Sequence, residues 1–463
     1  MKYKKIGKTV TINIIAFTQN GGNLLYSPMV NDFNKYSIDN NLNIKLKLNL
    51  FSELNSTIIT TDYESTLDSL FQRKSNKYDL IFFDNIYIKR FGPYLLNLKN
   101  VLPKDHIDMY MEGVAKQTCM YNDKLVGLPM TIDCTLLYYN QEYLDKYNKE
   151  LPKTWDDLIE TGQYILNEEK KLNNTDFVPY NGLFSELEIG ICSIYEFIYS
   201  FRNSVESSFP NIRSQEAVNA LEKMKEIKEK LNLDTIYKQD EGFTISKIFD
   251  KNYLFLKFWI IPYFVQVSRI TYLPGVKEGI SGSTIGGHNL GISIYSDPKH
   301  RNATIEALKF LTSKNMQRKY IALNDYFSPI PSLYEEDEVC SVVNCTFYKG
   351  FQLIARPILQ SNDYITYSTR FKNYIYDFLY RNKTSYEVLK NIDDITRYYY
   401  LSLNNEDTVM GLILFISAII IIIFMLGSLL FIFINKFKIY FSFLSNDFWI
   451  IYIIGLVLIP LAF

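Results

Sequence analysis

Polar side chains that directly follow apolar runs are the residues of this 463-residue chain best placed for chemistry. Asp84 and Asn85 end the run "YDLIFFDN", and Asp133 follows "LVGLPMTI". Carboxylate and amide groups in such positions can hydrogen-bond the polar groups of a small molecule. Each aspartate can equally cap a helix or bridge two parts of the fold, so both alternatives stay open.

Other residues extend this candidate binding set. Trp259 ends the run "FLKFW", where its ring can stack on a flat ligand face or pack in a core. The segment "SGSTIGGHN" contains Gly287, which lets a ligand approach the backbone, and His288, which can instead hydrogen-bond within the loop. Asn20 in "FTQNGG" can line a site or form a turn. The complete predicted set is Asn20, Asp84, Asn85, Asp133, Trp259, Gly287 and His288.

The sequence gives no support to covalent, metal-dependent or nucleotide chemistry. The three histidines and five cysteines lack zinc-type spacing, and the glycine-containing segment matches neither the dinucleotide nor the Walker pattern. Because no nucleophile, base and acid form a recognisable set, we expect no enzyme, no catalytic residue, no metal and no cofactor. A formal net charge of −1 gives no field that would attract nucleic acid.

Alternating strand-like and helix-like segments must position these residues. "TVTINIIAF" and "IKLKLNLF" alternate as strands, and "YDLIFFDN" is a short apolar run typical of a buried parallel strand. "PKTWDDLIETGQYIL" has Thr154 as an N-cap with Asp157 three residues later. This pattern predicts an α/β fold with more than one domain or lobe.

Val409 to Ile434 carries no charge, and at about 1.5 Å per residue it is long enough to cross a bilayer. Glu406 and Asp407 precede the run, whereas Lys436 and Lys438 follow it. The positive-inside rule therefore predicts residues 1–405 outside the plasma membrane, a first membrane helix at 408–435 and a cytoplasmic loop at 436–447.

A second apolar run covers residues 448–463 and is predicted to begin another membrane helix. The N-terminus has basic residues but no apolar stretch long enough for a signal peptide. An outer domain without a signal conflicts with the predicted topology. We therefore expect the sequence to be a fragment, incomplete at both ends.

Several stretches together resemble the family 1 extracellular solute-binding proteins, whose members include maltose-binding and other sugar-binding proteins. They are "YDLIFFDN", "DKLVGLPMTIDCTLLYYNQEYLDKY", "LPKTWDDLIETG", "FLKFW", "YLPGVKEGISGSTIGGHNLGI" and "ATIEALKFLTSKNMQRKYI". The resemblance implies a bilobal, type II periplasmic-binding-protein-like ectodomain that closes on a sugar-like ligand. It places lobe one at 1–129 and 271–322, and lobe two at 130–270 and 323–400.

The C-terminal part resembles the first two helices of class C G-protein-coupled receptors, on the apolar run, the loop "NKFKIYFSFLSNDFWII" and the glycine in "IIYIIGLVLI". This second resemblance implies a receptor whose outer clamp senses a carbohydrate-like ligand. It would signal through a helix bundle to a heterotrimeric G protein, with a homodimer as one arrangement. The alternative is a membrane-tethered solute-binding protein for uptake of sugars or oligosaccharides.

An oxidising exterior allows disulfide bonds and glycosylation. Four residues separate Cys340 from Cys345, a spacing that a turn can close, so we predict a disulfide between them. Cys119 with Cys192 is a second predicted pair, which leaves Cys134 as a thiol. The predicted glycosylation acceptors are Asn55, Asn173, Asn302, Asn344 and Asn382.

Overall fold

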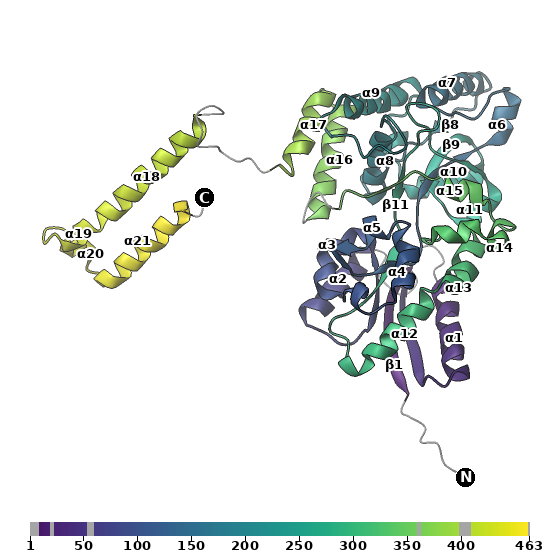
Figure 1. Cartoon of the computed structure of the whole chain (residues 1–463). Helices are drawn as coiled ribbons and strands as arrows, with labels where there is room; N and C mark the ends of the chain where they lie inside the picture. Colours follow the sequence, from purple (N-terminus) through teal and green to yellow (C-terminus); the bar gives the residue numbers. More distant parts are fainter. Residues whose placement is uncertain (1–8, 19–22, 53–59, 359–362, 398–408, 462–463) are drawn as a thin grey trace, which may run out of the picture. The chain divides into compact units, whose positions relative to one another are not determined.

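The computed structural model describes residues 9–18, 23–52, 60–358, 363–397 and 409–461. The chain divides into two compact units, Met1–Thr396 and Arg397–Phe463 (Figure 1). The first unit contains the alternating strands and helices that the sequence predicts. The described part of the second unit is helical.

A five-stranded sheet in the order β2-β1-β3-β12-β6 forms one layer of the first unit. β1 runs parallel to β2 and β3, whereas β12 runs antiparallel to β3 and β6. β1 and β3 are buried over most of their length, as expected for apolar strands covered by helices. The bounds are β1 Val10–Thr18, β2 Ile44–Ser52, β3 Leu80–Asp84, β6 Leu128–Pro129 and β12 His288–Ile292, with helices α1 Asn23–Asp39, α2 Thr60–Gln72 and α12 Arg301–Leu311.

A second, four-stranded sheet has the order β10-β7-β9-β8. β9 lies inside this sheet, antiparallel to β7 and parallel to β8, and six of its seven residues are buried. The bounds are β7 Thr135–Tyr139, β8 Val178–Tyr180, β9 Tyr253–Trp259 and β10 Arg269–Thr271, with helices α7 Trp155–Lys171, α8 Glu188–Tyr199, α9 Gln215–Lys230, α10 Glu241–Asp250, α16 Tyr364–Tyr380 and α17 Ser385–Asp394. The predicted lobe boundaries stay a prediction.

The start of α7 is formed by the residues that the sequence indicates. The Thr154 hydroxyl accepts a hydrogen bond from Asp157 N at 3.1 Å, and the Asp157 carboxylate accepts one from Thr154 N at 2.9 Å. This reciprocal capping box satisfies two backbone donors at the helix terminus. The other α-helices and strands in the described part of the first unit are α3 Ile88–Phe91, α4 Lys104–Met111, α5 Ala115–Thr118, β4 Met120–Tyr121, β5 Lys124–Leu125, α6 Gln141–Lys146, α11 Pro262–Val267, β11 Ser283–Ile285, α13 Lys314–Met316, α14 Asp337–Cys340, α15 Cys345–Lys349 and β13 Leu353–Ala355.

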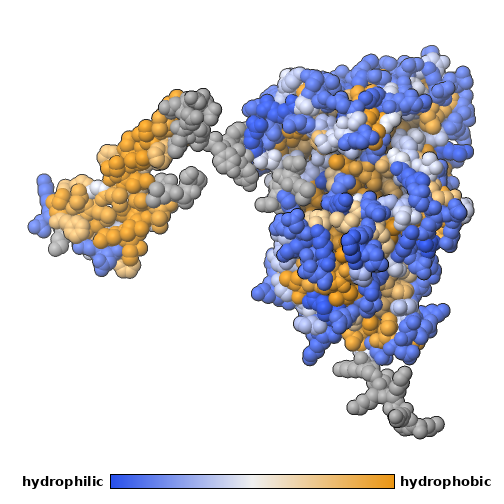
Figure 2. All heavy atoms as spheres, viewed as in Figure 1, coloured by the Kyte–Doolittle hydropathy of each residue, from blue (hydrophilic) through white to orange (hydrophobic). Residues whose placement is uncertain are grey.

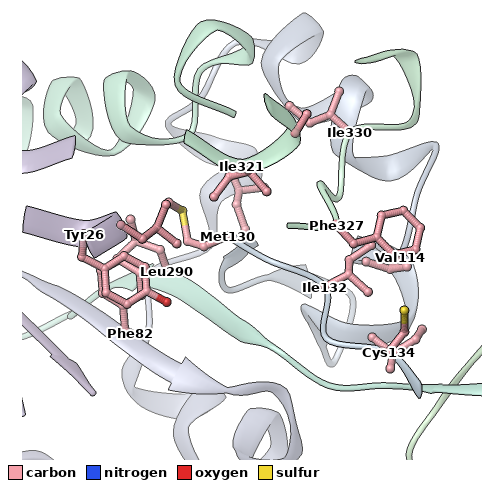
Figure 3. Packing of buried hydrophobic residues seen from close by; sticks show 14 of the residues in the cluster. Tyr26, Phe82, Val114, Met130, Ile132, Cys134, Leu290, Ile321, Phe327 and Ile330 are labelled. Atoms are coloured by element: carbon pink, nitrogen blue, oxygen red, sulfur yellow. The ribbon is translucent and has the colours of Figure 1, made fainter. Parts of the chain in front are cut away.

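Three chain segments, 130–134, 283–287 and 353–356, meet next to the two sheets, and we call them the junction segments. Gly286 N donates to Asp133 O at 2.6 Å, and β11 pairs in parallel with β13. Ile132 N donates to Phe327 O at 2.9 Å, and their side chains lie side by side in Figure 3. The junction segments are therefore joined by backbone hydrogen bonds and by a common apolar core.

A buried ion pair connects α8 to the junction segments. Glu196 Oε2 accepts hydrogen bonds from the Thr135 hydroxyl and from Thr284 N, the latter at 2.9 Å. Its Oε1 lies 3.1 Å from Lys257 Nζ, and both side chains are almost fully buried. Lys257 Nζ also donates to Ser193 Oγ at 2.7 Å. One carboxylate thus fixes the start of β7 and the middle of β11 next to β9.

The structure contains the Cys340–Cys345 disulfide that the sequence analysis predicts. The second predicted pair is wrong, because Cys119 and Cys192 are free thiols, as is Cys134. Cys119 Sγ donates to Asn289 Oδ1 at 3.1 Å beside the first sheet, whereas Cys192 lies on α8. Burial raises the pKa of the Cys119 thiol to about 12, which keeps it protonated.

The second unit consists of helices with apolar surfaces, drawn orange in Figure 2. Among the described residues, the segment Met410–Phe433 is the one helical stretch long and apolar enough to cross a membrane. It comprises α18 Met410–Ser428 and α19 Leu430–Phe433. The predicted second membrane helix corresponds to α21 Asn446–Leu461, whose apolar part is shorter, with α20 Lys438–Phe441 before it. Within the described residues of this unit, the structure therefore supports one candidate span and gives no evidence of a helix bundle.

Replacing Lys257 by Met should destabilise the chain, because it leaves the Glu196 carboxylate buried without its cation. We expect the free energy of unfolding to fall by about 3 kcal/mol. Adding Glu196→Gln removes the charge but keeps an acceptor for Thr284 N, so the double variant should recover part of the loss. Denaturant unfolding of the full chain in detergent micelles measures this. If the loss of stability in the double variant equals the sum of the losses in the two single variants, Lys257 and Glu196 do not stabilise each other.

Candidate functional site

The predicted binding residues at the end of β3 lie together in the structure. Asp84 caps the 3₁₀ turn Asn85–Tyr87, since its Oδ1 accepts a hydrogen bond from Ile86 N at 3.0 Å. The same oxygen accepts a hydrogen bond from Arg356 Nη2. The capping alternative left open for Asp84 is thus realised, and its carboxylate also binds a cation.

Asn85 is buried and uses its amide within the protein. Its Oδ1 accepts a hydrogen bond from Arg356 Nη2 at 2.7 Å, and its Nδ2 donates to Gly286 O at 3.1 Å. The backbone N–H of Asn85 donates a hydrogen bond to the Gly287 carbonyl oxygen at 3.4 Å. Asn85 therefore fastens β3 to a junction segment, and its role as a ligand contact remains a prediction.

Arg356 is the central residue that the sequence analysis missed. Its side chain is 3 % exposed and lies between Asp84 and Glu188, whose Oε1 is 3.5 Å from Arg356 Nη1. The Tyr364 hydroxyl donates to the same Glu188 oxygen. A signal was present in the sequence, because "LIARPI" places one arginine inside an otherwise uncharged apolar run.

Asp133 lies on a junction segment and is partly exposed. No residue in the described part of the chain hydrogen-bonds its carboxylate, in contrast to that of Asp84. Burial raises the pKa of Asp133, and the charge of Asp84 adds to this, while His288 and Arg356 oppose it. The carboxyl group of Asp133 therefore has hydrogen-bonding capacity that the described residues do not satisfy, and its role as a ligand contact remains a prediction.

Trp259, at the end of β9, is partly exposed rather than enclosed in the core. Its Nε1 donates to Glu241 Oε1 at 2.9 Å, which fixes the orientation of the ring. A Cβ atom built on Gly286 would lie 3.3 Å from Trp259 Cζ3 and 3.2 Å from the Cβ of Asp133. The absence of a side chain at Gly286 thus lets the indole and the Asp133 side chain both approach the backbone of this residue.

The predicted residues of the glycine segment also lie here. Gly287 has a φ of +98°, and a Cβ atom there would lie 2.3 Å from Thr131 O. Glycine is thus required for contact between junction segments, whatever its role toward a ligand. His288 is partly exposed and pairs with Asp84 across β12 and β3. Asn20 lies outside the described residues. We call Asp84, Asn85, Asp133, Trp259, His288 and Arg356 the junction site.

A cavity of about 390 Å³ adjoins the Arg356 side of the junction site. Its wall includes Tyr364, whose hydroxyl binds Glu188, and Tyr87, the last residue of the turn that Asp84 caps. The cavity is of a size typical for small-molecule sites. It is lined by Ile86, Tyr87, Lys89, Arg90, Ile358, Asp363, Tyr364 and Ile365.

Glu64 of α2 is a further titratable group that the sequence analysis missed. Its side chain is buried, and its Oε2 has no hydrogen-bond partner among the described residues. Burial raises the pKa of Glu64 to about 8, and the charge of Asp84 contributes. The structure thus favours a protonated carboxyl group at neutral pH.

The sequon asparagines within the described residues are exposed, and they are Asn173, Asn302, Asn344 and Asn382. Asn344 caps α15 through a hydrogen bond from Phe347 N at 3.1 Å. Asn55 lies outside the described residues. Glycosylation at these positions stays a prediction.

Comparison with known proteins identifies related sequences. A family model described as bacterial extracellular solute-binding protein matches residues 55–343. A protein of Deinococcus radiodurans, described as a probable ABC transporter-binding protein, is 23% identical over 339 residues. That match covers 69% of this chain and 79% of the relative.

Solved structures show the same fold. The maltose-bound MalE3 of T. maritima has a TM-score of 0.64 at 23% identity, covering 84% of this chain and 99% of its own. The GacH receptor of Streptomyces glaucescens, studied with and without acarbose, has a TM-score of 0.63 at 15% identity, covering 83% and 97%. The first unit therefore has a bilobal, periplasmic-binding-protein-like α/β fold.

Stability should depend on pH through Glu64. The folded-state pKa of Glu64, about 8, exceeds the ordinary value of 4.5, so the folded chain holds this proton more tightly than the unfolded chain. The stabilisation that results from protonated Glu64 is complete below pH 4.5 and is lost as pH rises through 8. Glu64→Gln, which stays neutral, should be more stable than the wild type above pH 8, by on the order of 2–4 kcal/mol. Denaturant unfolding of the full chain at several pH values tests this.

The matched control is Glu160→Gln, at an exposed position of α7. It should leave the pH profile of stability unchanged. If Glu64→Gln and the wild type show the same dependence of stability on pH, Glu64 is ionised at neutral pH in the folded chain.

Proposed function

This chain belongs to the bacterial extracellular solute-binding protein family, and from that premise we propose that it binds a carbohydrate at the junction site. The observation that carries the proposal is that the partly exposed side chains of Trp259 and Asp133 both lie beside Gly286. An oriented, partly exposed indole can stack on a sugar ring, while an unpaired carboxylate accepts hydrogen bonds from the hydroxyl groups. Maltose and acarbose in the solved relatives support this ligand class.

The proposed role is binding and delivery rather than catalysis. The related proteins are solute-binding proteins, which are not enzymes. The description of the Deinococcus relative supports an ABC transporter as the recipient of the sugar. The candidate span at Met410–Phe433 supports attachment to a bilayer, with the binding unit outside the cell. A membrane-tethered solute-binding protein for sugar uptake combines these features.

A receptor with several membrane helices is the second candidate. The observation in its favour is α21, a second apolar helix that packs against α18 within the second unit. The comparisons give no support to the class C receptor resemblance, to a G protein or to a homodimer. The tethered binding protein therefore takes precedence.

Trp259 should report binding and contribute to affinity. With a panel of maltose, maltotriose and arabino-oligosaccharides, a binder should change the tryptophan fluorescence of the full chain in detergent. Trp259→Phe should abolish this change. Loss of the stacking surface in Trp259→Ala should weaken affinity about ten- to a hundred-fold, equivalent to roughly 1–3 kcal/mol.

Trp155→Phe is the matched control, because Trp155 is 2 % exposed and its Nε1 donates to Ser200 Oγ at 2.9 Å within the second-sheet region. It should keep both the fluorescence change and the affinity. A sugar that binds Trp259→Ala as tightly as the wild type, measured by calorimetry, would place the binding site elsewhere.

Topology can be tested on intact cells. We expect protease or antibody access to residues of the first unit, such as an epitope inserted beside exposed Lys299, because basic residues follow the first span. An epitope beside Lys436 should be accessible only after permeabilisation. The reverse pattern would place the binding unit inside the cell and contradict a role in uptake.

A further inference from the structure

We propose that Arg356 determines the charge of the ligand that the junction site accepts, so that neutral, hydroxyl-rich sugars are preferred over amine-bearing ones. This inference rests on the carbohydrate-binding function proposed above and names the class of carbohydrate. It concerns a residue that is not among the binding residues predicted from the sequence. The argument starts from the contacts of the guanidinium group.

Arg356 contacts groups from two distant parts of the chain. Nη2 binds Asp84 and Asn85 at the end of β3, and Nη1 lies 3.5 Å from Glu188 at the start of α8. Asp84 and Glu188 are partly exposed, whereas the Arg356 side chain is almost fully buried. The cation is therefore shielded from solvent, whereas part of each carboxylate remains accessible from outside the protein.

Three carboxyl groups lie around the Arg356 guanidinium. Besides Asp84 and Glu188, the unpaired carboxylate of Asp133 lies within electrostatic range of Arg356. Burial raises the pKa of Glu188, Arg356 opposes that rise, and Asp84 adds to it. The other titratable groups nearby are His288 beside Asp133, Glu64 beside Asp84, Lys372 beside Glu188, Arg90 paired with Asp68, and the Lys257–Glu196 ion pair.

Arg356 is the buried cation that contacts both Asp84 and Glu188. Arg356 supplies one positive charge to the two carboxylates that it contacts, which reduces their attraction for a cation, and hydroxyl groups can bind there without bringing a charge. Without it, the two carboxylates and Asp133 would form an uncompensated acidic site, which attracts an ammonium group. The side chain at position 356 is thus expected to set the preference between a hydroxyl and an amine on the same sugar backbone.

The experiment compares cellotetraose with the tetramer of β-1,4-linked glucosamine, which carries ammonium groups on the same backbone. Affinities are measured by calorimetry on the full chain in detergent, at a mildly acidic pH where the amines are protonated. If the wild type binds another neutral oligosaccharide of the panel instead of cellotetraose, that oligosaccharide is compared with its own amino derivative. The measured quantity is the ratio of the two affinities.

Arg356→Gln should shift this ratio at least tenfold toward the amine-bearing sugar, and Glu188→Gln should shift it in the opposite direction. The double variant should return toward the wild-type ratio, because it restores the charge balance. A role of Arg356 in packing alone would lower both affinities equally. If Arg356→Gln does not fold, Glu188→Gln together with Arg356→Lys, which should keep the wild-type ratio, provides the test.

The outcomes separate the two proposals. Binding of a neutral sugar with a ratio that none of the variants changes would overturn the inference and leave the proposed function intact. A wild-type preference for the amine-bearing sugar would also overturn it. Failure of the wild type to bind any carbohydrate would overturn the proposed function and the inference together.

Discussion

The carboxylate of Glu196 binds two chain segments that are about 150 residues apart in the sequence and a lysine from a third strand. Thr135 begins β7, Thr284 lies in β11, and Lys257 belongs to β9, two residues before Trp259. A buried carboxylate without these partners would be strongly unfavourable, so the contacts must form together. The positions of Asp133 and Trp259 follow from them, because each is within two residues of a group that Glu196 fixes.

The sequence predicts those features that depend on neighbouring residues. The capping box at Thr154 is local, and the ends of apolar runs locate Asp84, Asp133 and Trp259 because a strand must leave the core somewhere. The disulfide at Cys340 is likewise set by a short spacing. Asp84, Asp133 and Trp259 lie near one another in the fold because the apolar runs that they follow or end all reach the junction segments.

Features that depend on distant partners could not be predicted in the same way. Arg356 contacts Asp84 across 272 positions, and Glu188 and Glu196 lie on a helix whose sequence reads as apolar scaffold. The pairing of Cys119 with Cys192 failed for the same reason, since only the fold shows that Cys119 binds Asn289 instead. The apolar run at 410–433 was recognisable from composition, whereas the interpretation of α21 as part of a receptor bundle rested on a short loop pattern.

The order of strands in the first sheet has a consequence for the growing chain on the ribosome. β3 is complete at Asp84, but β12, which pairs with it, begins only at His288. During synthesis, the partial sheet β2-β1-β3 therefore has an unpaired edge while some two hundred further residues emerge. An open apolar edge of this kind can pair with other nascent chains. Co-translational folding of this protein is thus expected to need either early folding of the intervening segment or a chaperone that covers β3 until β12 arrives.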